Sequence, residues 1–213
     1  GSERVLGLLA VSPSLAADEL AGARATAAAV GATLVEFETH EGDDSAYRAN
    51  GADRCYHCKS ELFSRISEDL VAAHAIDAVA YGENADDAVA LDRPGARAAT
   101  EHDVLRPLAG AGLTKPRVRA LARALGLAVA DKPAAPCLAS RIPHGQEVTA
   151  EKLGQIEAAE QKQSTALREV NERQQAAMNN CRQIRYMQSQ AEAAQRQRQH
   201  GELDRARIEP QRH

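Results

Sequence analysis

Short apolar runs alternate with helical patterns along the first 130 residues, and this alternation limits the folds open to the chain. Residues 5–11 form a nearly continuous apolar run, which is typical of a strand buried on both faces of a parallel sheet. Residues 33–38, 76–81 and 127–130 are expected to be further strands. Strands that alternate with helices predict an α/β fold whose sheet is parallel and whose crossovers are right-handed.

The segments between these runs carry helix signals. Ser14 is expected to cap a helix that ends at Gly31. Residues 39–53 are polar and acidic and are expected to form a loop, and further helices are expected after Cys58 and over residues 114–126. Their inward-facing residues are predicted to be Leu62, Phe63, Ile66, Leu70 and Val71 in the first and Val118, Leu121 and Leu125 in the second.

Length, charge and cysteine content exclude several classes of protein. The chain has 213 residues, enough for one domain with a core and an appendage. Its net charge of -4 argues against a nucleic-acid-binding protein. We find neither a membrane-spanning run nor a secretory signal, so we expect a cytoplasmic protein with no membrane partner. Four cysteines are too few for a disulfide scaffold.

Residues 131–145, called the Cys137 loop below, contain three prolines and a glycine, which exclude a regular helix or strand. An irregular segment that carries Cys, Ser, Arg, Lys and His is where a rigid scaffold places chemistry, although a turn with one buried thiol is the alternative. A second cysteine cluster, at Cys55 and Cys58, favours a functional loop over a structural turn. Cys55 and Cys58 have the spacing that lets two thiolates bind one metal centre, and Cys137 could complete a three-cysteine site.

An acidic loop follows the expected strand at residues 76–81. In open α/β sheets, ligands bind beyond the carboxyl ends of strands, so this loop is well placed for a nucleotide. A solvated acidic turn is the other interpretation. The candidate residues are Gly82, Asn84, Asp86 and Asp87.

The order and spacing of these motifs resemble the ATP-dependent sulfur transferases of the LarE family, from about residue 5 to residue 160. This resemblance implies a Rossmann-like parallel sheet of the adenine nucleotide alpha hydrolase type over residues 1–145, followed by a mainly helical segment over residues 146–213. The motifs are Arg54-Cys55-Tyr56-His57-Cys58-Lys59, Gly82-Glu83-Asn84-Ala85-Asp86-Asp87, Asp92-Arg93-Pro94-Gly95, Pro107-Leu108 with Gly112-Leu113-Thr114-Lys115, and the Cys137 loop.

The resemblance also implies a reaction. ATP, with Mg²⁺, adenylates a carboxylate of a pyridinium dicarboxylate mononucleotide, and a sulfur nucleophile then displaces AMP, as a step in the biosynthesis of a nickel-pincer cofactor. The residues that match the family are Ser140, Arg141 and Glu160 for the substrate, and Gly82, Asn84, Asp86 and Asp87 for the nucleotide.

Three thiolates leave one coordination position open on a [4Fe–4S] cluster, where an extra sulfide could be held for transfer, whereas a structural zinc ion would require a fourth protein ligand. The resemblance favours a [4Fe–4S] cluster on Cys55, Cys58 and Cys137. In the competing version, Cys137 gives up its own sulfur, and Cys55 and Cys58 are redox-active. His57 could be a fourth ligand, but we expect an exposed or capping histidine.

The sequence departs from the family in its phosphate loop. Related ATP pyrophosphatases carry a Ser-Gly-Gly-x-Asp-Ser loop whose backbone N–H groups bind the phosphates of ATP. The printed sequence contains no such motif. We therefore expect this polypeptide alone to bind ATP weakly.

A second departure is a glutamine-rich stretch at residues 161–199, which has no glycine or proline. We expect one long helix or a helical hairpin that forms a weak coiled coil within a homo-oligomer, with Cys181 buried. A mobile tail is the alternative. Apolar residues at near-heptad spacing are Leu153, Ile156, Leu167, Val170, Ala177, Cys181, Ile184 and Ala191.

Two other functions stay open at this point. The chain could be an inactive, metal-binding α/β fragment whose helical tail mediates oligomerisation. It could also be a relative of tRNA-thiolating enzymes, which share three-cysteine chemistry but usually present a basic face.

Overall fold

The structure is a computed structural model that describes residues 4–89 and 93–208. It divides into two compact units, Gly1–Ala159 and Glu160–His213. Asp92, which belongs to one of the motifs above, lies outside the described residues. The assignment of domains to residues 1–145 and 146–213 stays a prediction.

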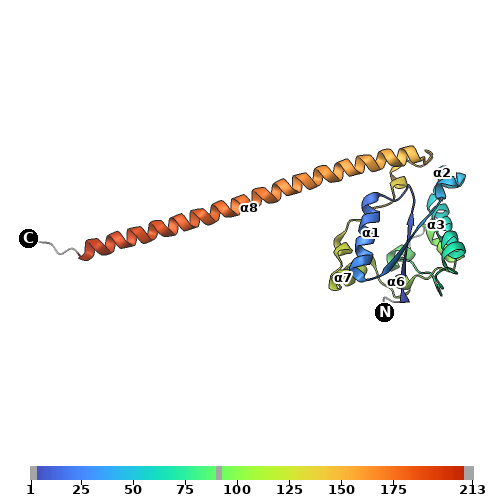
Figure 1. Cartoon of the computed structure of the whole chain (residues 1–213), viewed down its shortest axis with the longest axis horizontal. Coiled ribbons are helices and arrows are strands. Elements are labelled where there is room, and N and C mark those ends of the chain that lie inside the picture. The colour runs from blue at the N-terminus through green and yellow to red at the C-terminus, as the bar shows by residue number, and fades with distance from the viewer. Residues whose placement is uncertain (1–3, 90–92, 209–213) are drawn as a thin grey trace, which may run out of the picture. The chain divides into compact units, whose positions relative to one another are not determined.

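A two-stranded parallel sheet forms the start of the first unit (Figure 1). Strand β1 (Leu6–Val11) pairs with β2 (Thr33–Glu38), and helix α1 (Ala17–Val30) connects them. Gly31 ends α1 in the left-handed conformation, as the sequence predicted. The fold is therefore a mixed α/β fold with a parallel crossover, and helices make up most of it.

The other two expected strands are not regular strands. Residues 76–81 contribute a single parallel bridge between Ala80 and Leu105. Residues 127–130 fall largely in a 3₁₀ turn, η4 (Ala128–Asp131). Both stretches are rich in alanine, which packs poorly on a pleated surface, so the pattern overstated their strand character. The described sheet is thus narrower than the Rossmann-like sheet that the sequence predicted.

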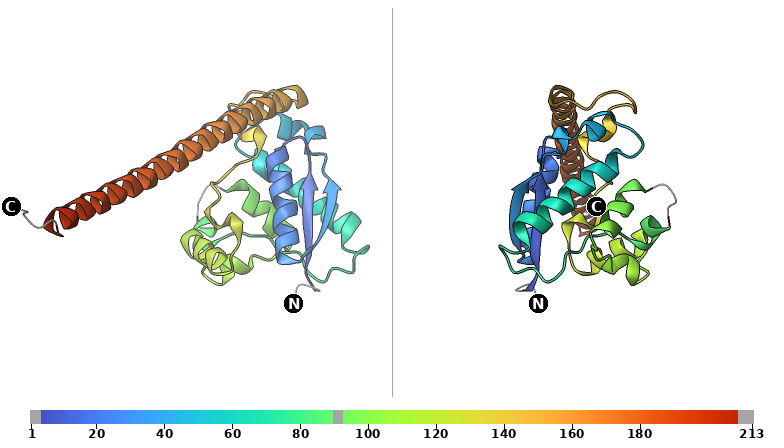
Figure 2. Two further views of the ribbon diagram at one scale, coloured as in Figure 1. Left: turned by 60° about the vertical axis from the view of Figure 1, so that its left-hand side comes forward. Right: turned by 90° about the vertical axis from the view of Figure 1, so that its right-hand side faces the viewer.

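Helices cover both faces of this sheet (Figure 2). On one face, Leu8 and Phe37 pack against residues of α3 (Arg54–Arg65) and α5 (Pro94–Glu101). On the other face, Glu36 accepts two hydrogen bonds from Arg24 of α1, each 2.6 Å long. Neither strand contains a fully buried residue.

Two apolar clusters form the core of the first unit, and α3 contacts both. Cys58 packs against the first, whereas Tyr56 and Leu62 pack against the second. The first core cluster consists of Tyr47, Leu138, Ala139, Ile142, Val148 and Leu153. The second core cluster consists of Phe63, Ile66, Ala98, Ala99 and Val104.

Short helical turns replace much of the expected loop structure. Within residues 39–53, a 3₁₀ turn and a short helix form instead of an irregular loop. The remaining elements are η2 (Glu41–Asp43), α2 (Ser45–Arg48), the π-helical η3 (Ile66–Leu70), α4 (Ala85–Ala88), α6 (Pro107–Gly110), α7 (Lys115–Ala124) and η5 (Leu138–Arg141).

The expectations for Ser14, Leu121 and Leu125 are wrong. Ser14 does not cap α1, because the helix begins at Ala17; its hydroxyl is buried and lies 2.5 Å from the hydroxyl of Tyr47. Leu121 and Leu125 do not face a core, since 47% and 66% of their surfaces are exposed.

Helix α8 (Ala150–Ile208) is a continuous helix of 59 residues, which confirms the helix expected over residues 161–199. Cys181 is exposed on it, so its expected burial is wrong. Across residues 4–89 and 93–208, no helix combines the length and the apolar character that crossing a membrane requires.

Candidate functional site

The first two cysteines lie near the start of α3, one turn apart. Because they are three residues apart in a helix, Cys55 and Cys58 share one helix face. Cys55 is exposed, and Cys58 is half-buried against the first core cluster. The helix begins at Arg54, about a turn earlier than the sequence pattern indicated, so both thiols stand on a regular element.

Asn50 fixes the second half of the Cys137 loop. It is fully buried and has a φ of 55°, a left-handed conformation that asparagine tolerates. Its Nδ2 lies 3.1, 2.9 and 3.0 Å from the carbonyl oxygens of Ile142, Pro143 and Gln146, and it donates to these acceptors. The N–H of Gly145 donates back to the carbonyl of Asn50 at 3.1 Å.

Arg54 joins α3 directly to the residues that follow Cys137. Its buried guanidinium donates to the carbonyl of Ala139 at 2.9 Å and also to the side-chain oxygen of Asn50. The connection between β1 and α1 also contacts the loop, because Leu138 N–H donates to the carbonyl of Ser14 at 2.9 Å. The connection after β1, the start of α3 and the Cys137 loop therefore meet at one place.

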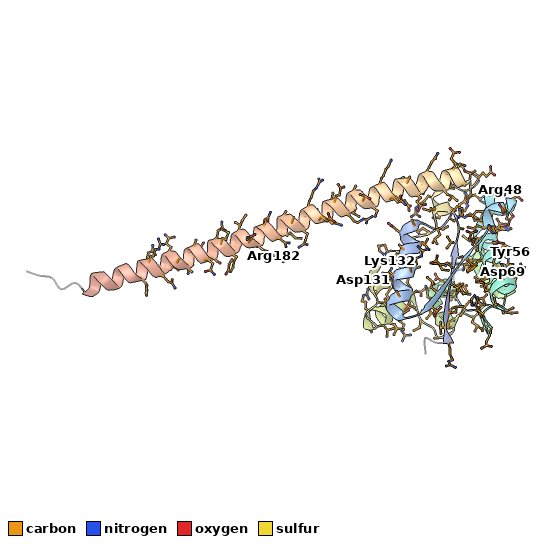
Figure 3. The ribbon with its side chains drawn as sticks, in the orientation of Figure 1. Arg48, Tyr56, Asp69, Asp131, Lys132 and Arg182 are labelled. Atoms are coloured by element: carbon orange, nitrogen blue, oxygen red, sulfur yellow. The ribbon has the colours of Figure 1, made fainter. Side chains whose placement is uncertain are left out.

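Contacts at both ends also hold this loop; Lys132 and Arg48, which take part in them, are labelled in Figure 3. Lys132 Nζ lies 2.7 Å from Glu19 of α1, and Arg119 of α7 donates to the carbonyl of Lys132 at 2.7 Å. Beyond the other end, Val148 N–H donates to the carbonyl of Arg48 at 2.9 Å. An irregular segment rich in proline is thus tied to elements on both sides.

The thiols of Cys55 and Cys137 both act on Cys58 electrostatically. Burial raises the pKa of Cys58 to about 12, and the carboxylate of Glu41 and the other two thiols add to this rise. In the described part of the chain, no three His, Cys, Asp or Glu side chains are arranged as ligands of a metal ion. The three-cysteine metal site therefore stays a prediction.

His57 contacts two carboxylates. Its Nδ1 lies 3.0 Å from Asp44, and its Nε2 lies 3.4 Å from Asp53. The ring nitrogens thus face the carboxylates that precede α2 and α3, and His57 is half-buried within α3, so it is neither the exposed nor the capping histidine that we expected.

Ser140 and Arg141 lie directly beside Cys137. The hydroxyl of Ser140 donates to the carbonyl of Cys137 at 2.7 Å, and Arg141 Nη1 donates to that hydroxyl at 3.0 Å. Both side chains are exposed, so they can reach a ligand outside the loop. Glu160 belongs to the second unit, and its role in substrate binding stays a prediction.

The polar side chains of the expected nucleotide loop make structural contacts. Asn84 caps α4 by accepting from the N–H groups of Asp86 and Asp87 at 3.0 and 3.1 Å. Asp86 also accepts from the N–H of Lys115 at 2.8 Å, and Asp87 pairs with Arg93. Gly82 is exposed at the start of the loop. These contacts fix the loop's shape, and its contact with a nucleotide stays a prediction.

The sequence pattern did not indicate the structural roles of Asn50, Arg54, Glu41 and Glu83, although Arg54 and Glu83 lie within motifs named above. The Asn-Gly step at residue 50 is a signal for a left-handed turn, and it could have identified Asn50. Glu83 is 4% exposed and lies 3.5 Å from Arg106, but no local pattern marks a buried carboxylate.

Comparison with models of protein families finds no match. Comparison with curated proteins does find relatives. The chain is 31% identical over 160 residues to pyridinium-3,5-bisthiocarboxylic acid mononucleotide synthase of Lactiplantibacillus plantarum, across 75% of this chain and 57% of that protein. The chain is a distant relative of that synthase.

An uncharacterized protein of Synechocystis sp. is 41% identical over 158 residues, across 74% of this chain and 58% of its own length. An uncharacterized protein of Methanocaldococcus jannaschii is 31% identical over 112 residues, across 53% of this chain and 43% of its own length. The chain spans about half the length of the curated relatives that it matches.

Proposed function

We propose that this chain carries the sulfur-transfer site of a LarE-type enzyme that inserts sulfur into a pyridinium dicarboxylate mononucleotide. The relationship to the synthase of Lactiplantibacillus plantarum supports this class of reaction. The observation that carries the proposal is the junction at Asn50 and Arg54, because it holds the cysteine-bearing helix against the Cys137 loop.

The reaction requires an activated carboxylate. A substrate carboxylate attacks the α-phosphate of ATP, pyrophosphate leaves, and an acyl adenylate forms. A sulfur nucleophile then attacks the acyl carbon, and AMP leaves. The chain's task in this scheme is to place the sulfur donor, the acyl group and the substrate phosphate next to one another.

Arg141 and Ser140 are suited to the substrate phosphate. A guanidinium donates two parallel hydrogen bonds to a phosphate, and such charge-assisted bonds are stronger than neutral ones. Since Ser140 bonds the carbonyl of Cys137, a phosphate held here lies near the thiol of that loop. Cys137 is exposed and can approach a bound substrate.

The donor set of Cys55, Cys58 and Cys137 fits an iron–sulfur cluster better than a zinc ion. A cluster takes soft thiolates on different irons, so its ligands need not converge on one point, whereas a structural zinc ion requires four convergent ligands. When bound, the cluster would supply an iron with a free position for sulfur. Cys55 and Cys58 would hold it from α3, and Cys137 would hold it from the loop.

The nucleotide is proposed to bind beside residues 82–87. Gly82 leaves room for close approach, and Asn84, Asp86 and Asp87 fix the shape of the loop through their own hydrogen bonds. Mg²⁺ would accompany the triphosphate of ATP, because the phosphates supply oxygen ligands that this ion prefers.

Isothermal titration with the pyridinium dicarboxylate mononucleotide tests the proposal. We expect Arg141→Ala to weaken binding by about 10-fold or more, because a hydrogen bond to a charged group is lost. Arg123→Ala removes another exposed arginine, which pairs with Asp131, and serves as the matched control. Equal affinity in all three proteins would reject the phosphate role.

A second measurement identifies the sulfur donor. The protein is incubated anaerobically with ATP, Mg²⁺ and the mononucleotide, and both the product and the Cys137 peptide are analysed by mass spectrometry. A thiocarboxylate product with an intact Cys137 supports a cluster-borne sulfur. Product together with loss of sulfur from Cys137 supports donation by that residue. A protein that neither binds the mononucleotide nor forms product would reject the proposed function.

A further inference from the structure

The part of α8 in the second unit exposes a row of apolar side chains. Every side chain from Thr165 to Gly201 is exposed. A patch of exposed apolar side chains marks a surface that binds another protein element. The exposed apolar side chains of α8 include Leu167, Val170, Met178, Ile184 and Met187, whose exposed fractions are 60%, 46%, 50%, 54% and 63%.

Three of these side chains, Leu167, Val170 and Ile184, belong to a seam with a seven-residue repeat, and Met178 and Met187 flank it. Ten seam positions between residues 163 and 195 carry no charge, although residues 161–199 contain ten charged side chains. Written as a heptad, the seam has Leu167, Gln174, Cys181, Gln188 and Gln195 at a, and Gln163, Val170, Ala177, Ile184 and Ala191 at d. We call these ten residues the neutral seam.

The spacing of the neutral seam specifies the kind of partner. A strict seven-residue repeat drifts by about 20° per heptad around a straight helix, so it stays in contact only with a helix that supercoils around it. The absence of charge along the seam favours an equally neutral partner over an acidic or basic one. The same seam on a second copy of this chain has that character.

We propose that α8 binds a second copy of itself as a parallel, in-register coiled coil through the neutral seam. In this arrangement each a residue faces its own copy, so Gln174, Gln188 and Gln195 meet amide to amide. Shifting the register by one heptad places Gln174 against Leu167 or Cys181, and reversing one helix so that a faces d places the amides mostly against Val170, Ile184 or alanines. A buried amide without a partner is costly, so the glutamines select the parallel register.

The flanking positions agree with this orientation. In a parallel pair, each g residue lies near the e residue five positions later on the other copy. Arg173 then faces Met178, and Met187 faces Glu192. Asn180 faces Arg185 in the same way, so no like charges meet. Arg182, labelled in Figure 3, is at an outer position.

Disulfide trapping tests the orientation on the full chain. Cys55, Cys58 and Cys137 are replaced by Ser, so that the test does not depend on the proposed function. Mild oxidation should then yield a covalent dimer through Cys181, which faces its own copy. In a background that also carries Cys181→Ser, Gln195→Cys should cross-link, and Arg196→Cys should cross-link roughly 10-fold more slowly or less, because it is at an outer position.

The remaining outcomes overturn the proposal. Cross-linking through Cys181 but not through the Gln195→Cys variant would mean an antiparallel pair, because Gln195 is far from the middle of the seam. Equal cross-linking by the Gln195→Cys and Arg196→Cys variants would mean random collision. A protein that sediments as a monomer over the whole accessible concentration range and forms no covalent dimer would mean that a second copy does not cover the seam.

Discussion

At the residue scale, the side chains that can do chemistry were predictable, whereas those that position them were not. Cys55, Cys58 and Cys137 stand out by residue type and spacing. Asn50 does not, because it bonds backbone carbonyls that are 92 to 96 positions away in the sequence, and a carbonyl has no sequence signature. Burial of an asparagine therefore became visible only in the structure.

Replacement of Asn50 should separate its hydrogen bonds from its backbone conformation. Asn50→Gly keeps the left-handed φ without strain, so its cost reflects lost hydrogen bonds, about 1–3 kcal/mol of unfolding free energy. Asn50→Ala adds about 1–2 kcal/mol for the left-handed conformation. Urea denaturation measures both. Equal stability of the two variants would show that the backbone relaxes out of this conformation.

Cys58 should be the least reactive of the three site thiols in metal-free protein. Because the thiolate is the nucleophile and burial raises the pKa of Cys58 to about 12, its alkylation at pH 8 should be roughly 100-fold slower than that of exposed Cys137. The rate at Cys58 should keep rising as the pH approaches 12. Peptide mapping after iodoacetamide treatment measures these rates.

The Glu41→Gln variant provides the control for this account. After burial, the carboxylate of Glu41 contributes most to the raised pKa of Cys58. Its removal should therefore accelerate labelling at Cys58 and leave the labelling rate of Cys137 unchanged. An unchanged rate at Cys58 would show that burial alone protects the thiol.

At the element scale, the sequence predicted the elements with strong periodicity and missed those that depend on partners. Strand β1 was predicted from its apolar run, and helix α8 was predicted from its long stretch without glycine or proline. Residues 76–81 and 127–130 were not, since a strand requires a neighbour with which to form a ladder, and alanine-rich runs do not reveal whether one exists. Helix α3 also differs from the prediction, because it begins before Cys55 and Cys58 and not after them.

The contact between α3 and α5 depends on Gly95. A Cβ atom at this position would lie 2.8 Å from Cδ of Lys59, whose Nζ is 4.3 Å from the centre of the Tyr81 ring. Glycine to alanine within a helix ordinarily stabilises by about 0.5–1 kcal/mol. Here we expect Gly95→Ala to lower the unfolding free energy instead, by about 1 kcal/mol or more, because the lysine stem must move.

Gly154→Ala is the matched variant, since it lies in α8 with no atom within 4 Å of the new Cβ. It should show the ordinary gain in thermal or urea stability. A gain of similar size at Gly95 would contradict the close packing of α3 against α5.

At the scale of the whole molecule, the proposal rests on three thiols from two distant parts of the sequence acting as one site. The sequence predicted that they belong together from their residue type and from a family resemblance, and the distant relationship to a pyridinium-3,5-bisthiocarboxylic acid mononucleotide synthase agrees with that resemblance. The structure adds that Arg54 and Asn50 tie the start of α3, which carries Cys55 and Cys58, to the Cys137 loop.

Anaerobic reconstitution with iron and sulfide tests this claim most directly. Bound iron and sulfide are measured in the parent protein and in Cys55→Ala, Cys58→Ala and Cys137→Ala, with Cys181→Ala, which removes an exposed thiol of the second unit, as the control. We predict an oxygen-sensitive cluster that each of the three variants loses and Cys181→Ala retains. Stoichiometric zinc without iron or sulfide, or a cluster that survives in Cys137→Ala, would contradict the account.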